Sequence, residues 1–519
     1  MLKATPGNAT LRYSLAGLFI AAMVVVLAVL VPAIGASVPR DLTPPVADVA
    51  TPEIRYFGRI GLGLQHLTGS GPSSTTGIAP LGQLESQLDA AAADPISQIR
   101  AAPVMFELSG WLAARDMLDR ADASLALYEA ALDHDFGDSV WPPPPTADAE
   151  PSFVPPPTLL TSDDARALAA DPVGTRAWIG RLRDDLDAFR SLLDSDGLGP
   201  DDLADDAKQR LLDRHDWYAR LALTANESAQ SPERLALQRD AAARLIVLGV
   251  MIAVAALVVL AGFALFIYAT VLLATRRLRV RANWQPELHP AHRATLLEAA
   301  ALFLVAFVVL SFVAQAFAAL LNVDPGRTTM LAVWLLALVP LWPLLRGMSV
   351  PQLRIALGWH ANGRGFHLPL KEAGLGLLGY MAGLPIVIVA VVFSLALVGL
   401  TGVEPQHPSV NQAIGGSTLD LVLLYLLATV WAPVVEETIF RGAMHASLRP
   451  AVPAVLAGVI NASVFAVIHP QGWALAPALA SLGFVFSLIR EWRGSLIAPI
   501  VAHAAHNAFV ITLAITILT

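Results

Sequence analysis

The chain has 519 residues, of which 55% are hydrophobic and 15% are charged. Because an average soluble protein carries about 25% charged residues, this composition predicts a chain that lies largely in a membrane. The formal net charge is −8, and no basic tract indicates a nucleic-acid partner. Cysteine is absent, which excludes disulfides, thiol catalysis and cysteine-held metals.

An apolar run near the start of the chain predicts an anchor helix. Residues 13–36 are uncharged and follow Lys3 and Arg12. The hydrophobic region of a secretory signal peptide has about 7–15 residues, whereas a membrane-spanning helix needs about 20. We therefore expect residues 1–37 to form an uncleaved N-terminal anchor, with a cleaved signal peptide as the alternative.

The next part of the chain, residues 38–243, has the pattern of a water-exposed helical domain. Apolar residues recur at helical spacing, with charges between them, in segments 110–135 and 175–195. The proline-rich piece WPPPPTADAEPSFVPPPT (141–158) predicts a semi-rigid linker between two helical lobes. No catalytic constellation is present, so we expect a spacer or a domain that docks a protein partner, with a ligand sensor as the alternative.

From residue 245 onward the chain consists mostly of long apolar runs. They predict an all-α fold, a polytopic membrane helix bundle of about nine spans, with domain 38–243 inserted between the first two. The second span and a basic loop occupy 244–296, and the other spans form a domain over 297–519. After the anchor, the predicted spans are 245–275, 299–321, 329–345, 373–400, 418–443, 452–470, 474–489 and 495–518.

Arginines predict the orientation of this multi-pass integral membrane protein. The segment RRLRVR directly follows the span that ends at Thr275, and basic residues mark the cytoplasmic side of a membrane. Lys3 and Arg12 place the N-terminus on the same side. Residues 38–243 are then extracytoplasmic, and a bacterial plasma membrane is the expected location.

Two adjacent glutamates follow an apolar run in WAPVVEETIFRGAMH (431–445). Only fifteen uncharged residues separate Asp420 from Glu436, and they reach about 22 Å as a helix, short of a hydrocarbon core near 30 Å. The spanning helix must therefore take in Asp420 or continue through Glu436. Ionisable groups inside a membrane are costly and usually functional, so a functional role is the starting hypothesis.

Helix geometry gives the two glutamates different roles. Glu437 and Arg441 are four residues apart, on one face, in the order that favours an ion pair. Glu436 is rotated by about 100° and has no basic residue at i+3 or i+4. It is expected to point into a separate cavity and act as a general base. Pro433 cannot donate to the carbonyl of Thr429 and is expected to kink the helix.

Three histidines and an asparagine add polar groups to the later apolar spans. His469 ends one span, while His503 and Asn507 lie four residues apart on another, with His506 on roughly the same face. Taken singly, each is more often a buried polar group with a structural partner. Together with Glu436 they offer a base, proton carriers and oxyanion donors.

The motifs EETIFR (436–441), FAVIH (465–469) and HAAHN (503–507) occur in this order on successive predicted membrane helices. The series resembles the CAAX-protease and bacteriocin-processing family of intramembrane endopeptidases, whose pattern is E-E-x-x-x-R, F-x-x-x-H and H-x-x-x-N. The resemblance is strongest over 419–510. It implies an intramembrane endopeptidase that hydrolyses a protein or peptide substrate, without specifying a prenylated one.

The resemblance also implies a role for each matching residue. Glu436 would activate the attacking water, with His469 helping to bind it, while His503 and Asn507 would stabilise the oxyanion. Glu437 and Arg441 would hold the site together. A metal is either not required or is zinc, for which Glu436, His469 and His503 offer a ligand set. His506 is not part of the pattern.

Two other functions and one geometric difficulty stay open. A non-catalytic scaffold or sensor would retain the fold and bind a partner through 38–243, and a proton-coupled transporter would use the same buried Glu and His residues. The arginines at 449, 490 and 493 place His469 near the outer tip of the 450–489 hairpin. Glu436 and His503 are expected nearer the cytoplasmic side.

Overall fold

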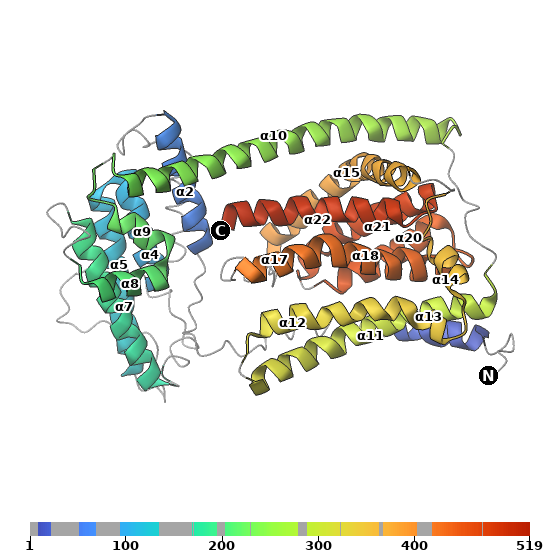
Figure 1. Ribbon diagram of the computed structural model, residues 1–519, viewed down its shortest axis with the longest axis horizontal. Coiled ribbons are helices and arrows are strands. Elements are labelled where there is room, and N and C mark those ends of the chain that lie inside the picture. Colours follow the sequence, from blue (N-terminus) through green and yellow to red (C-terminus); the bar gives the residue numbers. More distant parts are fainter. Residues whose placement is uncertain are drawn as a thin grey trace. The chain divides into compact units, whose positions relative to one another are not determined.

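The computed structural model describes residues 9–21, 51–68, 94–133, 169, 171–194, 203–228, 230–278, 288–321, 323–362, 367–401, 418–469 and 471–518. Every regular element within these ranges is a helix (Figure 1), as the sequence predicts. The chain divides into two compact units, one of residues 38–251 with 516–518, the other of 1–37 with 252–515 and 519. The predicted linker 141–158 and most of the predicted anchor 13–36 lie outside the described residues.

Unit 38–251 is built from short amphipathic helices and the first part of a long one. The predicted helical segments 110–135 and 175–195 are confirmed as α5 and α7. Aspartates begin two of the helices: Asp94 accepts a hydrogen bond from the backbone N–H of Ile96, and Asp171 from that of Gly174. The helices are α2 (Thr51–Thr68), α4 (Pro95–Ser109), α5 (Trp111–Leu132), α7 (Pro172–Leu193), α8 (Asp205–His215), α9 (Trp217–Leu223) and α10 (Pro232–Ala274).

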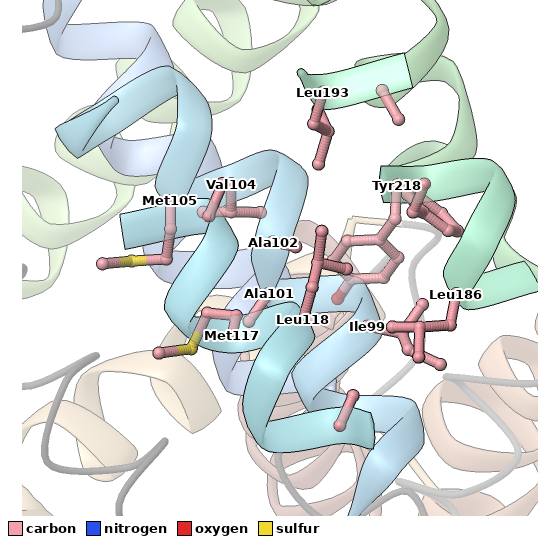
Figure 2. Close-up of a cluster of buried hydrophobic side chains, with 14 of the residues drawn as sticks. Ile99, Ala101, Ala102, Val104, Met105, Met117, Leu118, Leu186, Leu193 and Tyr218 are labelled. Carbon is pink, nitrogen blue, oxygen red and sulfur yellow. The ribbon is translucent and has the colours of Figure 1, made fainter. Parts of the chain in front are cut away.

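One apolar cluster holds unit 38–251 together. Figure 2 shows Met105 and Val104 of α4 beside Met117 and Leu118 of α5, with Tyr218 of α9 on the other side of the cluster. The two central helices can turn sharply into each other because Gly110, between them, has a φ of 91°, which glycine adopts readily. The unit therefore has a hydrophobic core of its own.

The second unit, of residues 1–37 with 252–515 and 519, contains most of the long apolar helices and is called the membrane unit below. Within the described residues, seven helices are long and apolar enough to cross a membrane: Pro232–Ala274, Pro290–Leu321, Pro325–Leu345, Leu368–Thr401, Thr418–Leu448, Trp473–Arg493 and Ile497–Thr516. Their elements are α10, α11 (Pro290–Leu321), α12 (Pro325–Val333), η3 (Trp334–Leu341), α13 (Trp342–Leu345), α15 (Leu368–Thr401), α17 (Thr418–Leu426), η4 (Leu427–Trp431), α18 (Ala432–Glu437), η5 (Thr438–Met444), α19 (His445–Leu448), η6 (Trp473–Leu475), α21 (Ala476–Arg493) and α22 (Ile497–Leu518). A short helix, α14 (Val350–Leu357), connects two of them.

One of the nine predicted spans is too short to cross the membrane. Helix α20 (Ala454–Val467), predicted as a span over 452–470, has 14 residues, which reach about 21 Å and fall short of the hydrocarbon thickness. The described part of the anchor, Ala9–Ala21, is also a shorter apolar helix. It packs on the membrane unit, where Arg12 pairs with Glu298 at 2.6 Å and the Tyr13 hydroxyl donates to the Ser447 carbonyl.

Several arginines used to predict the orientation bind groups inside the membrane unit. Arg490 is fully buried and donates to the carbonyl oxygens of Arg441 and Leu357. Arg493 pairs with buried Glu372 at 2.7 Å. These guanidinium groups therefore tie helices together, a role that a count of basic residues in loops does not reveal.

A glycine allows α15 to approach the helix that carries His503. A Cβ atom on Gly376 would overlap the backbone carbonyl of Ala498, in the first turn of α22. Close approach at small residues is a common way for membrane helices to associate, because van der Waals contact replaces the hydrophobic effect there. Gly376 thus helps to fix the position of α22.

Candidate active site

The site is built on one long helical run, Thr418–Leu448, which contains Asp420, Glu436 and Arg441. The helix both takes in Asp420 and continues past Glu436, so the two alternatives hold together. Asp420, near its start, forms a two-point ion pair with Arg327, with N···O distances of 2.6 and 2.8 Å. Two π-helical turns, η4 and η5, flank the short α18 that carries both glutamates. Such turns inside α-helices are frequent at functional sites.

The first π turn ends where Pro433 interrupts the backbone ladder. The N–H of Ala432 bonds to the carbonyl of Leu427 in i→i+5 fashion. The next such bond would join residue 433 to Ala428, but proline has no N–H to donate. The side-chain amide of Asn507 donates to the Ala428 carbonyl instead, at 2.8 Å. The irregularity predicted at Pro433 is thus a π turn that α22 supports.

The second π turn is supported by side chains of two other helices. The Asn461 amide of α20 donates to the Phe440 carbonyl, and Nε of Arg490 of α21 donates to the Arg441 carbonyl at 3.2 Å. Because π turns misalign backbone donors and acceptors, these side-chain bonds satisfy carbonyls that would otherwise lack partners. The irregular helix is thereby fixed from three sides, by α20, α21 and α22.

Glu437 and Arg441 form the ion pair that their spacing predicts. Nη1 of Arg441 lies 2.8 Å from Oε1 of Glu437, and neither side chain has exposed surface. The guanidinium also donates to the Gly483 carbonyl at 2.7 Å, and its carbon atom lies 4.8 Å from the centre of the Phe465 ring. A buried charge needs such a set of partners to offset its desolvation.

His503 shares the same carboxylate oxygen. Its Nδ1 lies 3.0 Å from Oε1 of Glu437, and its ring stacks on Phe486 with centroids 5.0 Å apart. Because an ionised carboxylate can only accept, Nδ1 carries the proton and Nε2 keeps its lone pair. Glu437 therefore fixes both the direction of the ring and its tautomer.

His469 reaches the site because α20 is short. Its Nδ1 lies 2.6 Å from the carbonyl oxygen of Phe465. The Phe465 ring lies 4.5 Å from the ring of His469 and 6.0 Å from that of His503, between centroids. The Phe465 ring therefore contacts both histidines, at the end of a helix that is too short to span.

Glu436 is in a different situation from its neighbour. Its Oε2 atom is buried and has no hydrogen-bond partner among the residues that the structure describes. His503, Glu437 and Arg441 are close enough to act on it electrostatically. Glu437 also has a buried Oε2 without a partner, but its Oε1 is held by Arg441 and His503, whereas Glu436 makes neither contact. The two glutamates are thus divided as their helix faces predict.

The remaining polar residues of the third motif have structural partners. Asn507 supports the Ala428 carbonyl, as described above. His506, which is not part of the motif pattern, lies with Nδ1 2.8 Å from the hydroxyl of Tyr380 on α15. That contact accounts for His506 as a link between α22 and α15.

The residues that enclose the buried charges lie outside the three motifs and were not predicted. Phe486 and Gly483 lie on α21, which carries no member of the three motifs. Gly483 leaves room for the guanidinium, because a Cβ there would come within 3.1 Å of Nη2 of Arg441. A buried arginine needs aromatic faces and carbonyls around it, so its presence was the one signal that such residues had to exist.

The sequence offered Glu436, His469 and His503 as zinc ligands. Within the described ranges, no three His, Asp or Glu side chains form a group that could hold a metal ion. Both histidines bond an oxygen atom through Nδ1, which orients Nε2 in the same way for a water molecule or a metal. Zinc therefore stays a hypothesis.

Comparison with known proteins gives one match. Residues 418–509 match the family described as type II CAAX prenyl endopeptidase Rce1-like. The resemblance is confirmed over this segment. All three motifs lie within it, and the family consists of intramembrane proteases. Neither the curated proteins nor the solved structures give a match.

The adjacent glutamates allow a matched stability test. Glu437→Gln removes the negative charge next to buried Arg441, and an unpaired buried charge costs about 3–5 kcal/mol. Glu436→Gln removes no ion pair, so its free energy of unfolding should stay within about 1 kcal/mol of the wild type. Thermal unfolding of both variants in the same detergent measures this difference. Equal destabilisation of the two would contradict the division of roles.

Proposed function

We propose that this chain is an intramembrane endopeptidase that hydrolyses a peptide bond of a protein or peptide substrate, using water activated by Glu436. The observation that carries the proposal is the buried Oε2 of Glu436, which has no partner in the described part of the chain. Glu436 also lacks the contacts with Arg441 and His503 that hold Oε1 of the adjacent Glu437. A carboxylate in this state can accept a proton from water. The match of residues 418–509 to a family of intramembrane proteases supports the reaction type.

In the proposed reaction, Glu436 takes a proton from a water molecule as the water oxygen attacks the carbonyl carbon of the peptide bond. The resulting tetrahedral oxyanion needs nearby donors, a role that we assign to His503 with the second amide N–H of Asn507. His503 takes a proton from solvent before the attack and then donates through Nε2, and Glu437 stabilises that imidazolium through Nδ1. Glu436 then returns its proton to the leaving amine, which breaks the C–N bond.

His469 is assigned to the attacking water. Its Nδ1 bonds to the Phe465 carbonyl, so the neutral ring carries its proton there and presents Nε2 as an acceptor. An acceptor beside Glu436 would orient a water O–H. Arg441 acts indirectly in this scheme, by keeping Glu437 ionised and in place.

The proposal predicts that Glu436→Gln abolishes cleavage. Loss of a general base lowers a rate by about 10²- to 10⁴-fold. Because the substrate class is open, the wild type and the variant are reconstituted with a membrane-protein extract, and new N-termini are counted by mass spectrometry. Glu129→Gln, a partly exposed glutamate on α5 that pairs with Arg183, is the matched control and should cut like the wild type.

Two outcomes of this experiment would change the proposal. New N-termini at the wild-type rate from folded Glu436→Gln would remove Glu436 as the base and favour a scaffold or transporter. A zinc chelator added to the wild-type reaction should leave cleavage unchanged. If the chelator abolishes cleavage and added zinc restores it, the metal-free reaction is wrong. The reaction would then use zinc held by Glu436, His469 and His503.

We further propose that residues 38–243 lie on the extracytoplasmic side, supported by the four arginines that follow Thr275. Because the chain has no cysteine, single introduced cysteines can report this directly. A membrane-impermeant maleimide should label Leu112→Cys, at a position that is 79% exposed, in intact cells. It should label Thr275→Cys only after permeabilisation. The reverse pattern would contradict this orientation.

A further inference from the structure

Helices α2 and α10 pack closely where α10 leaves unit 38–251. A Cβ atom on Gly63 would come within 2.9 Å of the Ala241 carbonyl, so the glycine lets the two backbones approach. Beside this contact a small pocket lies between the helices and is open to solvent on one side. Its lining includes Tyr56, Arg59 and Ile60 of α2, with Arg244, Leu245 and Leu248 of α10.

Arg59 is the unusual group in this lining. It is only 7% exposed, and its Nε and Nη1 atoms are buried without a hydrogen-bond partner among the described residues. Its guanidinium lies 5.3 Å from the centre of the Trp217 ring, which supplies one face of contact but accepts no in-plane hydrogen bond. A buried guanidinium with unused donors is costly unless an anion joins it.

The neighbouring charges leave Arg59 uncompensated. Arg55 pairs with Asp216 at 3.0 Å, and Arg244 pairs with Asp240 at 2.9 Å. Burial, together with Arg244 and Arg55, lowers the pKa of Arg59 to about 10, so the group still carries its charge at neutral pH. Asp216 also pairs with Arg220 at 3.2 Å, so the cluster of four arginines and two aspartates has two positive charges in excess.

The position of the pocket along α10 indicates where an anion would come from. Arg244 is the last charged residue before the uncharged run that extends to Thr275. Exposed apolar side chains begin directly after it, with Ile246 and Val247. This part of α10 therefore lies at the boundary between water and hydrocarbon, the level of lipid headgroups. Guanidinium groups match the geometry of phosphate oxygens.

We propose that the pocket between α2 and α10 binds the phosphate of an anionic phospholipid, with Arg59 as its central donor. The excess positive charge of this arginine cluster favours a lipid with net negative charge over a zwitterionic one. Leu245 and Leu248 supply an apolar wall for the start of the acyl chains. The site would tie unit 38–251 to the membrane surface at a fixed place on α10.

The test uses the full chain, stripped of lipid in a neutral detergent. Native mass spectrometry follows its binding of short-chain phosphatidylglycerol, with phosphatidylcholine and inorganic phosphate as separate arms. Arg59→Gln should weaken phosphatidylglycerol binding by about tenfold or more, as expected for loss of a charge-assisted hydrogen bond. Arg115→Gln is the matched control, since Arg115 is 61% exposed and lines no part of the pocket. It should bind like the wild type.

Thermal unfolding provides a second readout. Without lipid, Arg59→Gln should be at least as stable as the wild type, because it removes a buried unpaired charge. Phosphatidylglycerol should raise the unfolding temperature of the wild type only. Equal binding by Arg59→Gln and the wild type would overturn the proposal, as would equal binding of phosphatidylcholine. Binding of inorganic phosphate but not of phosphatidylglycerol would overturn the lipid assignment.

Discussion

One carboxylate oxygen organises the candidate site. Oε1 of Glu437 holds the guanidinium of Arg441 on one side and Nδ1 of His503 on the other. All three groups are buried, so each depends on the others to offset the cost of leaving water. The motif on α18 and η5 is thereby joined to the motif on α22, and Phe465 of the second motif packs against both Arg441 and His503.

This arrangement requires an irregular helix. The two π turns around α18 leave some carbonyl oxygens without well-aligned backbone donors. Side chains from three other helices donate hydrogen bonds to these oxygens. Asn507 therefore has a structural contact as well as its proposed part in binding the oxyanion. The same bonds that keep the irregular helix in place also set the distance between the glutamates and the histidines.

Several features of the candidate site were predictable from the spacing of residues along one helix. The i, i+4 relation of Glu437 and Arg441 predicted their ion pair, and the rotation of Glu436 predicted that it lacks these contacts. The count from Asp420 predicted that the spanning helix includes a charged residue. What spacing could not give was contact between distant segments. Phe486, Gly483 and Tyr380 lie outside the motifs, and the length of α20 depended on where its helix stops, which apolar composition does not mark.

In unit 38–251 the helices were predictable from the sequence, but the pocket was not. Its helical segments were predicted from periodicity, yet its pocket was not, because Tyr56 and Arg244 are nearly two hundred residues apart in the chain. An arginine without a carboxylate partner cannot be recognised in a sequence that has many of both. Only the packing of α2 on α10 distinguishes Arg59 from the exposed arginines of the same unit.

The tautomer of His503 tests the central claim most directly. Nitrogen-15 NMR of histidine-labelled protein, with His503→Gln used to assign the signal, distinguishes a proton on Nδ1 from one on Nε2. The shared-oxygen arrangement predicts the Nδ1–H form in the wild type and in Glu436→Gln, and its loss in Glu437→Leu, which has no acceptor. An Nε2–H form in the wild type, or a signal that Glu437→Leu leaves unchanged, would contradict it.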